Sequence, residues 1–470
     1  MLINRRISLA VGLLVMMAFT LACGLQVGVQ DGQSNTPEGG PLSSPIPLTD
    51  AQPTGPAPTV PEETGEGSTE QPTETAPTPE GEMPGGESGV LRVAYVKDED
   101  LWLWEENGSQ QAITSSGGVQ EVRLSSDGQL VAFTRRVDDF QSELWVVNTD
   151  GSEERLLVSA NDFEGLDPEQ RDPDSIALSP HRFDWVPGSH TLVFNTIQRY
   201  QGPGLGNFDD LRQVDAGSGA LTTLLPAGQG GDFHFSPDGT QAALVTPEQI
   251  SLMDADGSQL RPAVLTYEPV LTYSEYLYYA GPVWAPDSSY LMAAIPPADP
   301  MAEPLGPTRL YRIPVDGSSA EEIGSVTAFN LGGFGVVFSP DLTHIAYLRP
   351  VGQPPENTYE LRVADSSGSN DSLFLSAPNL VLHGWTADPQ RFFFSMGSAM
   401  EMQVGVLGNG YQPLIPSSGG VFELRWIDPQ RHLYLQENAG AIELRLGQLN
   451  GPHSLIDSLT GGLPAYDFSN

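Results

Sequence analysis

The sequence predicts an all-β protein, a β-propeller of four-stranded blades, and three observations lead to that fold class. A repeat recurs roughly every 40 to 60 residues from position 91 onward. Each copy holds short segments in which apolar and polar residues alternate, as they do in half-buried strands. The segments are separated by Ser-Pro-Asp-Gly or Asp-Gly-Ser, which suit the positive φ angles of tight hairpin turns. Four such strands in each copy match the period of a propeller blade.

The clearest copy of the repeat begins at Asp232. It reads Asp-Phe-His-Phe-Ser-Pro-Asp-Gly, and further strands follow at Gln249 and Leu260. Variants of this phrase occur along the rest of the chain, each with a large apolar residue just before its first turn. These pivot residues are Leu124, Trp185, Phe235, Trp284, Phe338, Trp385 and Trp426. A β-sandwich or a row of solenoid domains is the alternative arrangement for so many short strands.

The two ends of the repeat array complement each other. The first unit has strands near Val93, Asp100 and Gln111 but no innermost strand, whereas residues 463–470 match an innermost strand that stops inside its turn motif. We therefore expect the C-terminal strand to complete the first blade, which leaves no unpaired sheet edge. This closure gives a ring of eight blades, with seven as the alternative.

The repeat also resembles a known propeller family. Its Ser-Pro-Asp-Gly turn, its Ile-Ala-Phe-like strand and its Leu-Trp-Val strand ending in Asp-Gly-Ser are similar to the repeats of TolB-type and prolyl-oligopeptidase-type proteins. The resemblance covers residues 91–470 and implies an architecture rather than an activity. TolB has an α/β domain before a smaller propeller, and the oligopeptidases add an α/β-hydrolase domain. Neither domain has a counterpart in this sequence, so no partner contact or catalytic residue is carried over.

The first 23 residues are typical of an export signal. Arg5 and Arg6 precede a charge-free apolar run at 7–22, somewhat short for a membrane span of about 20 residues. The segment Thr-Leu-Ala-Cys that ends at Cys23 resembles the lipobox of bacterial lipoproteins, in which the cysteine is lipidated. We expect a lipoprotein signal peptide at 1–22 and a lipid on Cys23, with an uncleaved anchor helix as the alternative.

Residues 23–90 are expected to form a linker. Pro, Thr, Glu, Gly and Ser prevail from about 30 to 89, where no Lys or Arg occurs. So few apolar side chains cannot offset the entropy of the chain, and we expect the segment to be disordered. It would hold the propeller domain at 91–470 away from the lipid surface. The protein would then be anchored to the cell membrane or the outer membrane by lipid alone, facing outside the cytoplasm.

Charge and cysteine content exclude several classes of partner. The formal net charge is -39, from 60 acidic and 21 basic side chains. Such a surface repels phosphate backbones, so nucleic acid is not an expected partner. The single cysteine and the scattered histidines lack the spacing of zinc sites. No cofactor is expected, with Ca²⁺ as the one candidate.

The long insertions all belong to one rim of the predicted ring. In a blade, the second-to-third and blade-to-blade connections share a rim, and here they contain 159–180, 196–209, 267–281, 296–307 and 350–357. Long loops on a rigid scaffold often carry binding residues. The candidate ligand-binding residues on this rim are Arg199, Tyr200, Phe208, Tyr267, Tyr273, Tyr276, Tyr278 and Tyr279. The alternative is that the tyrosines pack the loop onto neighbouring blades.

One of these insertions is rich in carboxylates. Oxygen ligands suit Ca²⁺, and the candidate ligands are Asp162, Glu164, Asp167, Asp172 and Asp174. A solvated acidic loop is the alternative.

No catalytic motif stands out. The sequence contains no G-x-S-x-G elbow, Walker loop, dinucleotide fingerprint or zincin helix. We expect a monomeric, non-catalytic binding or scaffolding module for an extracytoplasmic protein, peptide or glycan. The alternative is a carbohydrate-active or other hydrolytic enzyme with carboxylates that converge in the propeller channel. A structural role in the envelope is a third possibility.

Overall fold

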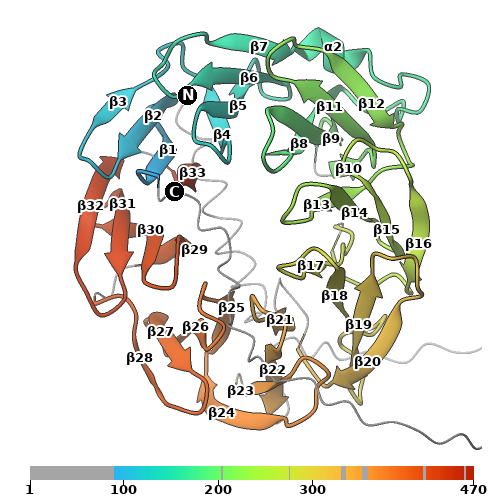
Figure 1. Ribbon diagram of the computed structural model, residues 1–470, viewed down its shortest axis with the longest axis vertical. Coiled ribbons are helices and arrows are strands. Elements are labelled where there is room, and N and C mark those ends of the chain that lie inside the picture. The colour runs from blue at the N-terminus through green and yellow to red at the C-terminus, as the bar shows by residue number, and fades with distance from the viewer. Residues whose placement is uncertain are drawn as a thin grey trace, which may run out of the picture. The chain divides into compact units, whose positions relative to one another are not determined.

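The computed structural model describes residues 89–470, apart from 203–204, 275, 330–334, 352–357, 417–419 and 460–461. Eight sheets follow one another around a closed ring (Figure 1). The predicted fold class, an all-β propeller of four-stranded blades, is therefore confirmed, with eight blades rather than seven. The signal peptide, Cys23 and the linker up to residue 88 lie outside the described residues.

Each blade takes four main strands. The first contains β33 (Tyr466–Ser469), β1 (Arg92–Lys97), β2 (Asp100–Glu105) and β3 (Gln110–Ala112). The second contains β4 (Val119–Leu124), β5 (Leu130–Arg136), β6 (Ser142–Asn148) and β7 (Arg155–Val158). The third contains β8 (Ala177–Trp185), β9 (Thr191–Arg199), β11 (Leu211–Asp215) and β12 (Leu221–Leu225), with β10 (Leu205–Asn207) added to it. The fourth contains β13 (Asp232–Phe235), β14 (Gln241–Val245), β15 (Gln249–Asp254) and β16 (Arg261–Thr266).

The remaining blades follow the same plan. The fifth contains β17 (Val283–Trp284), β18 (Tyr290–Ile295), β19 (Thr308–Pro314) and β20 (Glu321–Val326). The sixth contains β21 (Val337–Phe338), β22 (His344–Val351), β23 (Thr358–Asp365) and β24 (Ser372–Pro378). The seventh contains β25 (Val381–Trp385), β26 (Arg391–Met396), β27 (Glu401–Val406) and β28 (Tyr411–Pro413). The eighth contains β29 (Val421–Trp426), β30 (Arg431–Asn438), β31 (Ala441–Gln448) and β32 (His453–Leu459).

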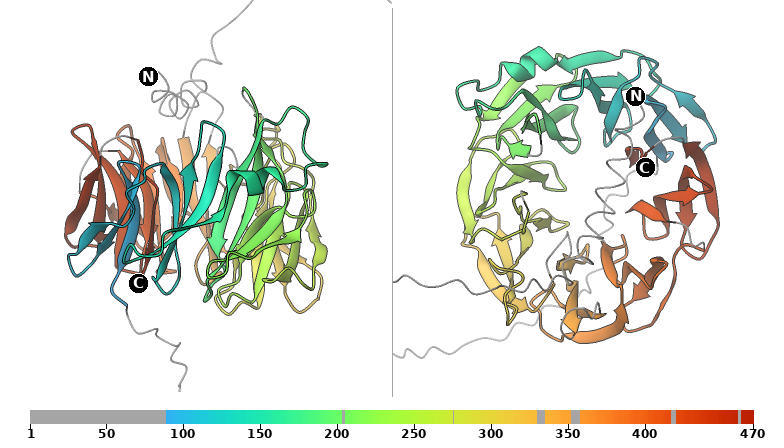
Figure 2. Two further views of the ribbon diagram at one scale, coloured as in Figure 1. Left: turned by 90° about the horizontal axis from the view of Figure 1, so that it is seen from above. Right: turned by 180° about the vertical axis from the view of Figure 1, so that it is seen from behind.

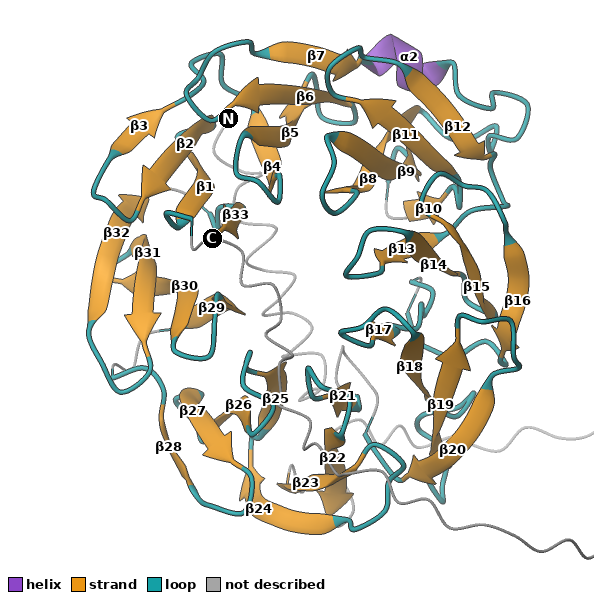
Figure 3. Ribbon diagram, viewed as in Figure 1, coloured by secondary structure: helices purple, strands orange, loops and turns teal. Residues whose placement is uncertain are grey.

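In each blade the strands are ordered from the centre of the ring outward. Figure 2 shows the blades from the side and from behind. Within the described residues the one helix is α2 (Ala160–Glu164), at the outer edge of the ring in Figure 3. None of the helical structure in this part of the chain is long and apolar enough to cross a membrane.

The chain termini of the propeller meet in the first blade. β33 pairs antiparallel with β1, with Tyr466 opposite Tyr95 and Ser469 opposite Arg92. The C-terminal strand thus supplies the innermost strand that the first repeat lacks, as predicted. Tyr466 is buried with Leu91, Val93 and the strands of the eighth blade. The ring is therefore closed by a strand from the opposite end of the sequence.

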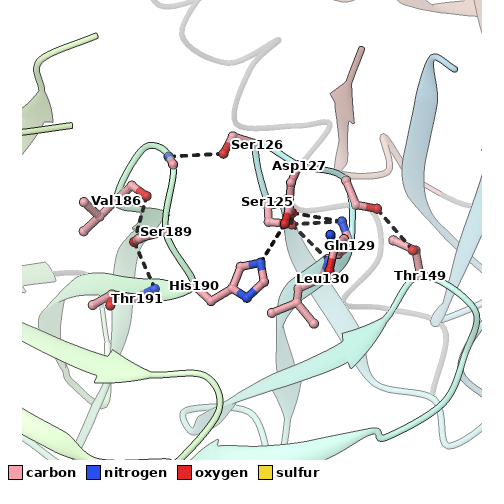
Figure 4. Close-up of polar contacts among 12 residues, drawn as sticks. Ser125, Ser126, Asp127, Gln129, Leu130, Thr149, Val186, Ser189, His190 and Thr191 are labelled. Carbon is pink, nitrogen blue, oxygen red and sulfur yellow. Dashed lines mark hydrogen bonds and ion pairs between the residues drawn. The ribbon is translucent and has the colours of Figure 1, made fainter. Parts of the chain in front are cut away.

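The repeated Ser-x-Asp-Gly motif forms the tight turns of one rim. In the second blade, Ser125 Oγ donates to Asp127 Oδ1 at 2.6 Å, and the same oxygen accepts the Gln129 amide at 3.1 Å. Gly128 follows with a φ of 66°, a conformation that costs glycine little. Figure 4 shows that this turn meets the third blade, where His190 Nε2 lies 2.9 Å from Asp127 Oδ2. The motif therefore also joins neighbouring blades.

Apolar clusters fill the spaces between blades, and the pivot tryptophans connect them. Since side chains alternate across a strand, each pivot side chain enters an interface between blades. Three indole N–H groups donate to a carbonyl of the preceding blade's innermost strand: Trp185 to Arg123 at 3.0 Å, Trp284 to His234 at 2.9 Å and Trp385 to Val337 at 3.0 Å. These bonds satisfy buried indole donors and set the spacing of adjacent blades.

A histidine is buried between the seventh and eighth blades. His432 is fully buried, and its ring centroid lies 4.9 Å from that of Trp426 and 5.5 Å from that of His453. Gly447 makes room for it, because a Cβ there would lie 2.3 Å from His432 Nε2. Within the described residues neither ring nitrogen has a hydrogen-bond partner. Burial, assisted by the charge of His453, lowers the pKa of His432 to about 4.

This burial predicts a loss of stability in mild acid. Below pH 6.5 the unfolded chain binds a proton at His432, whereas the folded chain does not until about pH 4. The free energy of unfolding should therefore fall as the pH drops through this window, by about 3 kcal/mol in total from this residue. Denaturant titrations of the wild type and of His432→Leu at pH 7 and pH 4.5 measure the difference. An identical pH dependence in both proteins would contradict the prediction.

Candidate functional site

The described insertions all lie on the rim opposite the Ser-x-Asp-Gly turns. Residues 200–210 join β9 to β11, 267–282 join β16 to β17, and 296–307 join β18 to β19. In an antiparallel blade these connections share a rim with the blade-to-blade link at 159–176. Two insertions contain more regular structure than expected. Ser159 caps α2 through a capping box with Asp162, and β10 pairs with the end of β9.

Two of these loops form an exposed apolar patch. The loop after β16 is fastened to the loop after β18 by the Leu271 amide, which donates to the Ala298 carbonyl at 2.8 Å. Five large side chains on the two loops are between 54% and 64% exposed. We call this group the rim patch, and its members are Leu271, Tyr273, Tyr276, Leu277 and Met301. Because exposed apolar groups of this size gather at interaction sites, the rim patch is the candidate functional site.

Tyr273 connects the two loops of the rim patch. Its hydroxyl donates to Asp299 Oδ1 at 2.5 Å, and this bond raises the pKa of the tyrosine. Asp299 Oδ1 also accepts the Met301 amide at 2.9 Å, so one carboxylate orders both loops. The φ of Tyr273 is 57°, in the left-handed region that aromatic residues rarely adopt. Backbone strain of this kind gathers at functional sites, because it persists only where the surroundings hold it in place.

The other three candidate tyrosines pack inward. Tyr267, Tyr278 and Tyr279 lie against the apolar cluster between the fourth and fifth blades. The Tyr267 hydroxyl donates to the Thr246 carbonyl at 2.6 Å, and burial raises its pKa to about 12. The Tyr279 hydroxyl donates to Asp209 Oδ1 at 3.0 Å. The structure thus separates the tyrosine-rich loop into an inner packing group and the exposed pair Tyr273 and Tyr276.

The candidates on the third blade occupy different surroundings. Phe208 is 4% exposed and belongs to the apolar cluster between the second and third blades. The ring of Tyr200 covers Gly206, and its hydroxyl lies 3.4 Å from Asp172 Oδ2. Arg199 is half-buried at the end of β9, and desolvation lowers its pKa. These residues shape the insertion of the third blade.

Four of the five candidate carboxylates of the acidic loop bind groups of the chain itself. Asp162 accepts the Ser159 amide in the capping box of α2, and Glu164 forms an ion pair with Arg171. Asp167 Oδ2 lies 2.5 Å from Nη2 of Arg212 and accepts the Ala227 amide at 2.8 Å. Asp172 Oδ1 accepts the amide of Asp174 at 2.9 Å. Across the described part of the chain, no group of three or more His, Cys, Asp or Glu is placed to hold a metal ion.

A further group of side chains, outside the sequence-based candidates, lines the inner wall of the ring. It consists of the residue before each pivot position and its neighbour two places earlier, all on innermost strands, and β-bulges in β4, β8 and β29 interrupt the alternation of side chains there. In the eighth, second, third and fourth blades both positions are charged or titratable, and in the first blade Asp467, which precedes Phe468, is charged. We call the group the charged arc, and its members are Glu423, Arg425, Asp467, Glu121, Arg123, Arg182, Asp184, Asp232 and His234. The spacing to the pivot residues is the sequence signal that identifies it.

Known proteins resemble this chain in structure, at low sequence identity. No protein-family model matches the chain, and no curated protein matches its sequence. A structure from a study of two prolyl endopeptidases is similar over 74% of this chain and 50% of its own, at 12% identity and a TM-score of 0.48. Dipeptidyl peptidase 4 of Porphyromonas gingivalis is similar over 72% and 53%, at 13% identity and a TM-score of 0.47. TolB of Acinetobacter baumannii is similar over 80% and 82%, at 12% identity and a TM-score of 0.34.

The chain spans about half the length of the two peptidases that it resembles. At 12% and 13% identity, the similarity concerns the fold alone. Propellers of the TolB and prolyl-endopeptidase types are thus among the solved structures similar to this chain, as the repeat motif predicts.

Proposed function

We propose that this protein is a lipid-anchored, extracytoplasmic binding or scaffolding module, and that the rim patch is its contact with a partner protein, peptide or glycan. The observation that carries the proposal is the exposure of Tyr273 and Tyr276, at 60% and 56%, on one loop that the Tyr273–Asp299 hydrogen bond fastens to the neighbouring loop. Tyrosine gives a large contact area and loses little conformational entropy when it is immobilised. The anchor is supported by the basic, apolar and cysteine-containing segment that ends at Cys23.

Replacement of both exposed tyrosines by alanine should abolish partner capture. Envelope extracts are passed over the immobilised protein and the captured species are identified by mass spectrometry. The binding of each identified species is then measured with the purified protein. Because buried interface tyrosines are among the strongest contributors to affinity, Tyr273→Ala with Tyr276→Ala should weaken binding by about tenfold or more.

Tyr411→Ala is the matched control. Tyr411 is 48% exposed but belongs to the seventh blade, far along the chain from the rim patch. A partner that is lost from the double variant and kept by this control supports the proposal. Equal binding by all three proteins, with unchanged melting temperatures, would overturn the role of the rim patch.

The alternative function, a hydrolytic enzyme, would use carboxylates of the charged arc. Desolvation raises the pKa of both Glu121 and Asp184, and perturbed carboxylates of this kind are common at active sites. Hydrolysis of oligosaccharide and peptide libraries by the purified protein tests this alternative. Turnover that disappears in Asp184→Asn would favour the enzyme over the binding module.

A further inference from the structure

Three aromatic side chains with polar atoms meet on one face of the eighth blade. In the register of this sheet, His432 of β30 lies opposite Gly447 of β31, and Gly447 lies opposite His453 of β32. Tyr434 follows His432 by two positions, so both side chains are on the same face of β30. The ring centroids of the two histidines and the tyrosine lie 5.5 to 5.7 Å from one another. The three rings therefore form a nearly equilateral triangle.

Gly447 allows the two histidines to approach each other. A Cβ at this position would lie 2.3 Å from His432 Nε2 and 2.8 Å from His453 Nδ1, so both nitrogens are close to one point above the glycine. Two imidazoles on one tetrahedral ion have ring centroids about 5 Å apart, since each metal–nitrogen bond is about 2.0–2.1 Å long. The observed separation of 5.5 Å is close to this value.

The Tyr434 hydroxyl is a third donor beside the two imidazoles. Its oxygen lies 3.0 Å from His453 Nδ1. Ligand atoms of one tetrahedral ion are about 3.3 Å apart, so the hydroxyl oxygen and this nitrogen can bind the same ion. Tyr434 is buried, whereas His453 is half-buried on the outermost strand of the blade. An ion can therefore enter past His453, and water can take the fourth position.

His432 has unused capacity to bind a ligand. It is 0% exposed, and neither of its ring nitrogens has a hydrogen-bond partner in the part of the chain that the structure describes. A buried polar atom without a partner costs about 1–3 kcal/mol, and a bound ion removes this cost at one nitrogen. Burial also lowers the pKa of both His432 and His453. The rings are thus neutral at pH 7, which is the form that binds a metal ion.

The charge and the donor types around the rings suit a transition-metal ion. Arg445 lies opposite Tyr434 in the strand pair, but its Nη2 is 2.6 Å from Glu443 Oε2, so its charge is balanced. Two nitrogens and one phenol oxygen are ligands that Zn²⁺ accepts, whereas Ca²⁺ and Mg²⁺ take oxygen ligands. The described residues hold no metal-binding group of three His, Cys, Asp or Glu, and here a tyrosine supplies the third ligand.

We propose that His432 Nε2, His453 Nδ1 and Tyr434 Oη bind one Zn²⁺ ion on this face of the eighth blade. The ion fastens β32, the outermost strand, to β30 and thereby stabilises the fold. Tyr434 and His453 are 19 positions apart, and only the pairing of β30, β31 and β32 brings their donors together. The site is independent of the rim patch, which belongs to loops of the fourth and fifth blades.

Titration calorimetry with ZnCl₂ tests the site on the full chain, prepared without a histidine tag. The buffer contains excess CaCl₂, because Ca²⁺ occupies the exposed carboxylates of this acidic protein. We expect one Zn²⁺ per protein and a higher melting temperature in its presence. His453→Gln should weaken the binding by about tenfold or more, because it removes one ligand. Tyr434→Phe keeps the ring in place and should also weaken it, and normal binding by this variant would exclude the hydroxyl as a ligand.

His190→Gln is the matched control. His190 is exposed and lies 2.9 Å from Asp127, so it represents a surface histidine beside a carboxylate. This variant should bind Zn²⁺ as the wild type does. The proposal is wrong if the wild type binds no Zn²⁺ under these conditions, if a folded His453→Gln variant binds it equally well, or if His190→Gln weakens the binding as much as His453→Gln does.

Discussion

Removal of residues 463–470 should lower the melting temperature by roughly 10 °C or more. The deletion removes β33, and with it the innermost strand of the first blade. Tyr466, 6% exposed, leaves the cluster between the eighth and first blades, and loss of a buried aromatic side chain alone costs about 3–5 kcal/mol. The edge of β1 also loses its ladder partner. Differential scanning calorimetry of the truncated and complete proteins measures the effect.

A circular permutant is the matched control for this deletion. Asn470 and Gly89 are neighbours, since a Cβ added to Gly89 would lie 3.5 Å from the Asn470 carbonyl carbon. Residues 463–470 can therefore be joined ahead of Gly89, directly or through one glycine, with the pairing of β33 and β1 retained. We expect this permutant to melt within a few degrees of the original protein. A truncated protein that melts like the complete one would contradict closure by the C-terminal strand.

Arg212→Met should destabilise the protein by about 3–5 kcal/mol, because it leaves a buried carboxylate without its cation. Arg212 and Asp210 are almost fully buried, and Arg212 Nε lies 3.0 Å from Asp210 Oδ2. Asp210 also accepts the Thr196 amide at 2.8 Å. A second carboxylate, Asp167, binds the same guanidinium from the acidic loop at 2.5 Å. One arginine thus joins two insertions, 159–176 and 200–210, to β11 of the third blade.

A double-mutant cycle in denaturant tests this assignment. Adding Asp210→Asn to Arg212→Met removes the stranded charge, and we expect the double variant to be more stable than Arg212→Met alone. Arg136→Met is the control, since Arg136 and Glu99 form an exposed pair at 3.0 Å, and it should cost less than about 1 kcal/mol. If Arg212→Met costs no more than this control, the buried network is not a stabilising element.

The sequence predicted the tyrosine-rich loop but not which of its tyrosines are exposed. The sequence placed five tyrosines on one long loop, and all five do lie on or beside it. Nothing in the alternation of residues separates Tyr273 and Tyr276 from Tyr267, Tyr278 and Tyr279, because a loop has no regular period. The separation depends on which side chains reach the cluster around Trp284 and Ile295, residues supplied by the fifth blade.

The sequence by itself determined the repeat, the tight turns, the strand that closes the ring and the rim that carries the insertions. These features follow from local chemistry, namely alternation within strands and Ser-x-Asp-Gly or Asp-Gly-Ser at turns, which acts over a few residues. Only the tertiary structure decided that Arg212 binds Asp167 and that Arg425 binds Asp467, partners separated by 45 and 42 positions. The same holds for the charged arc. Its members come from five blades, and only the closure of the ring brings their charges within reach of one another.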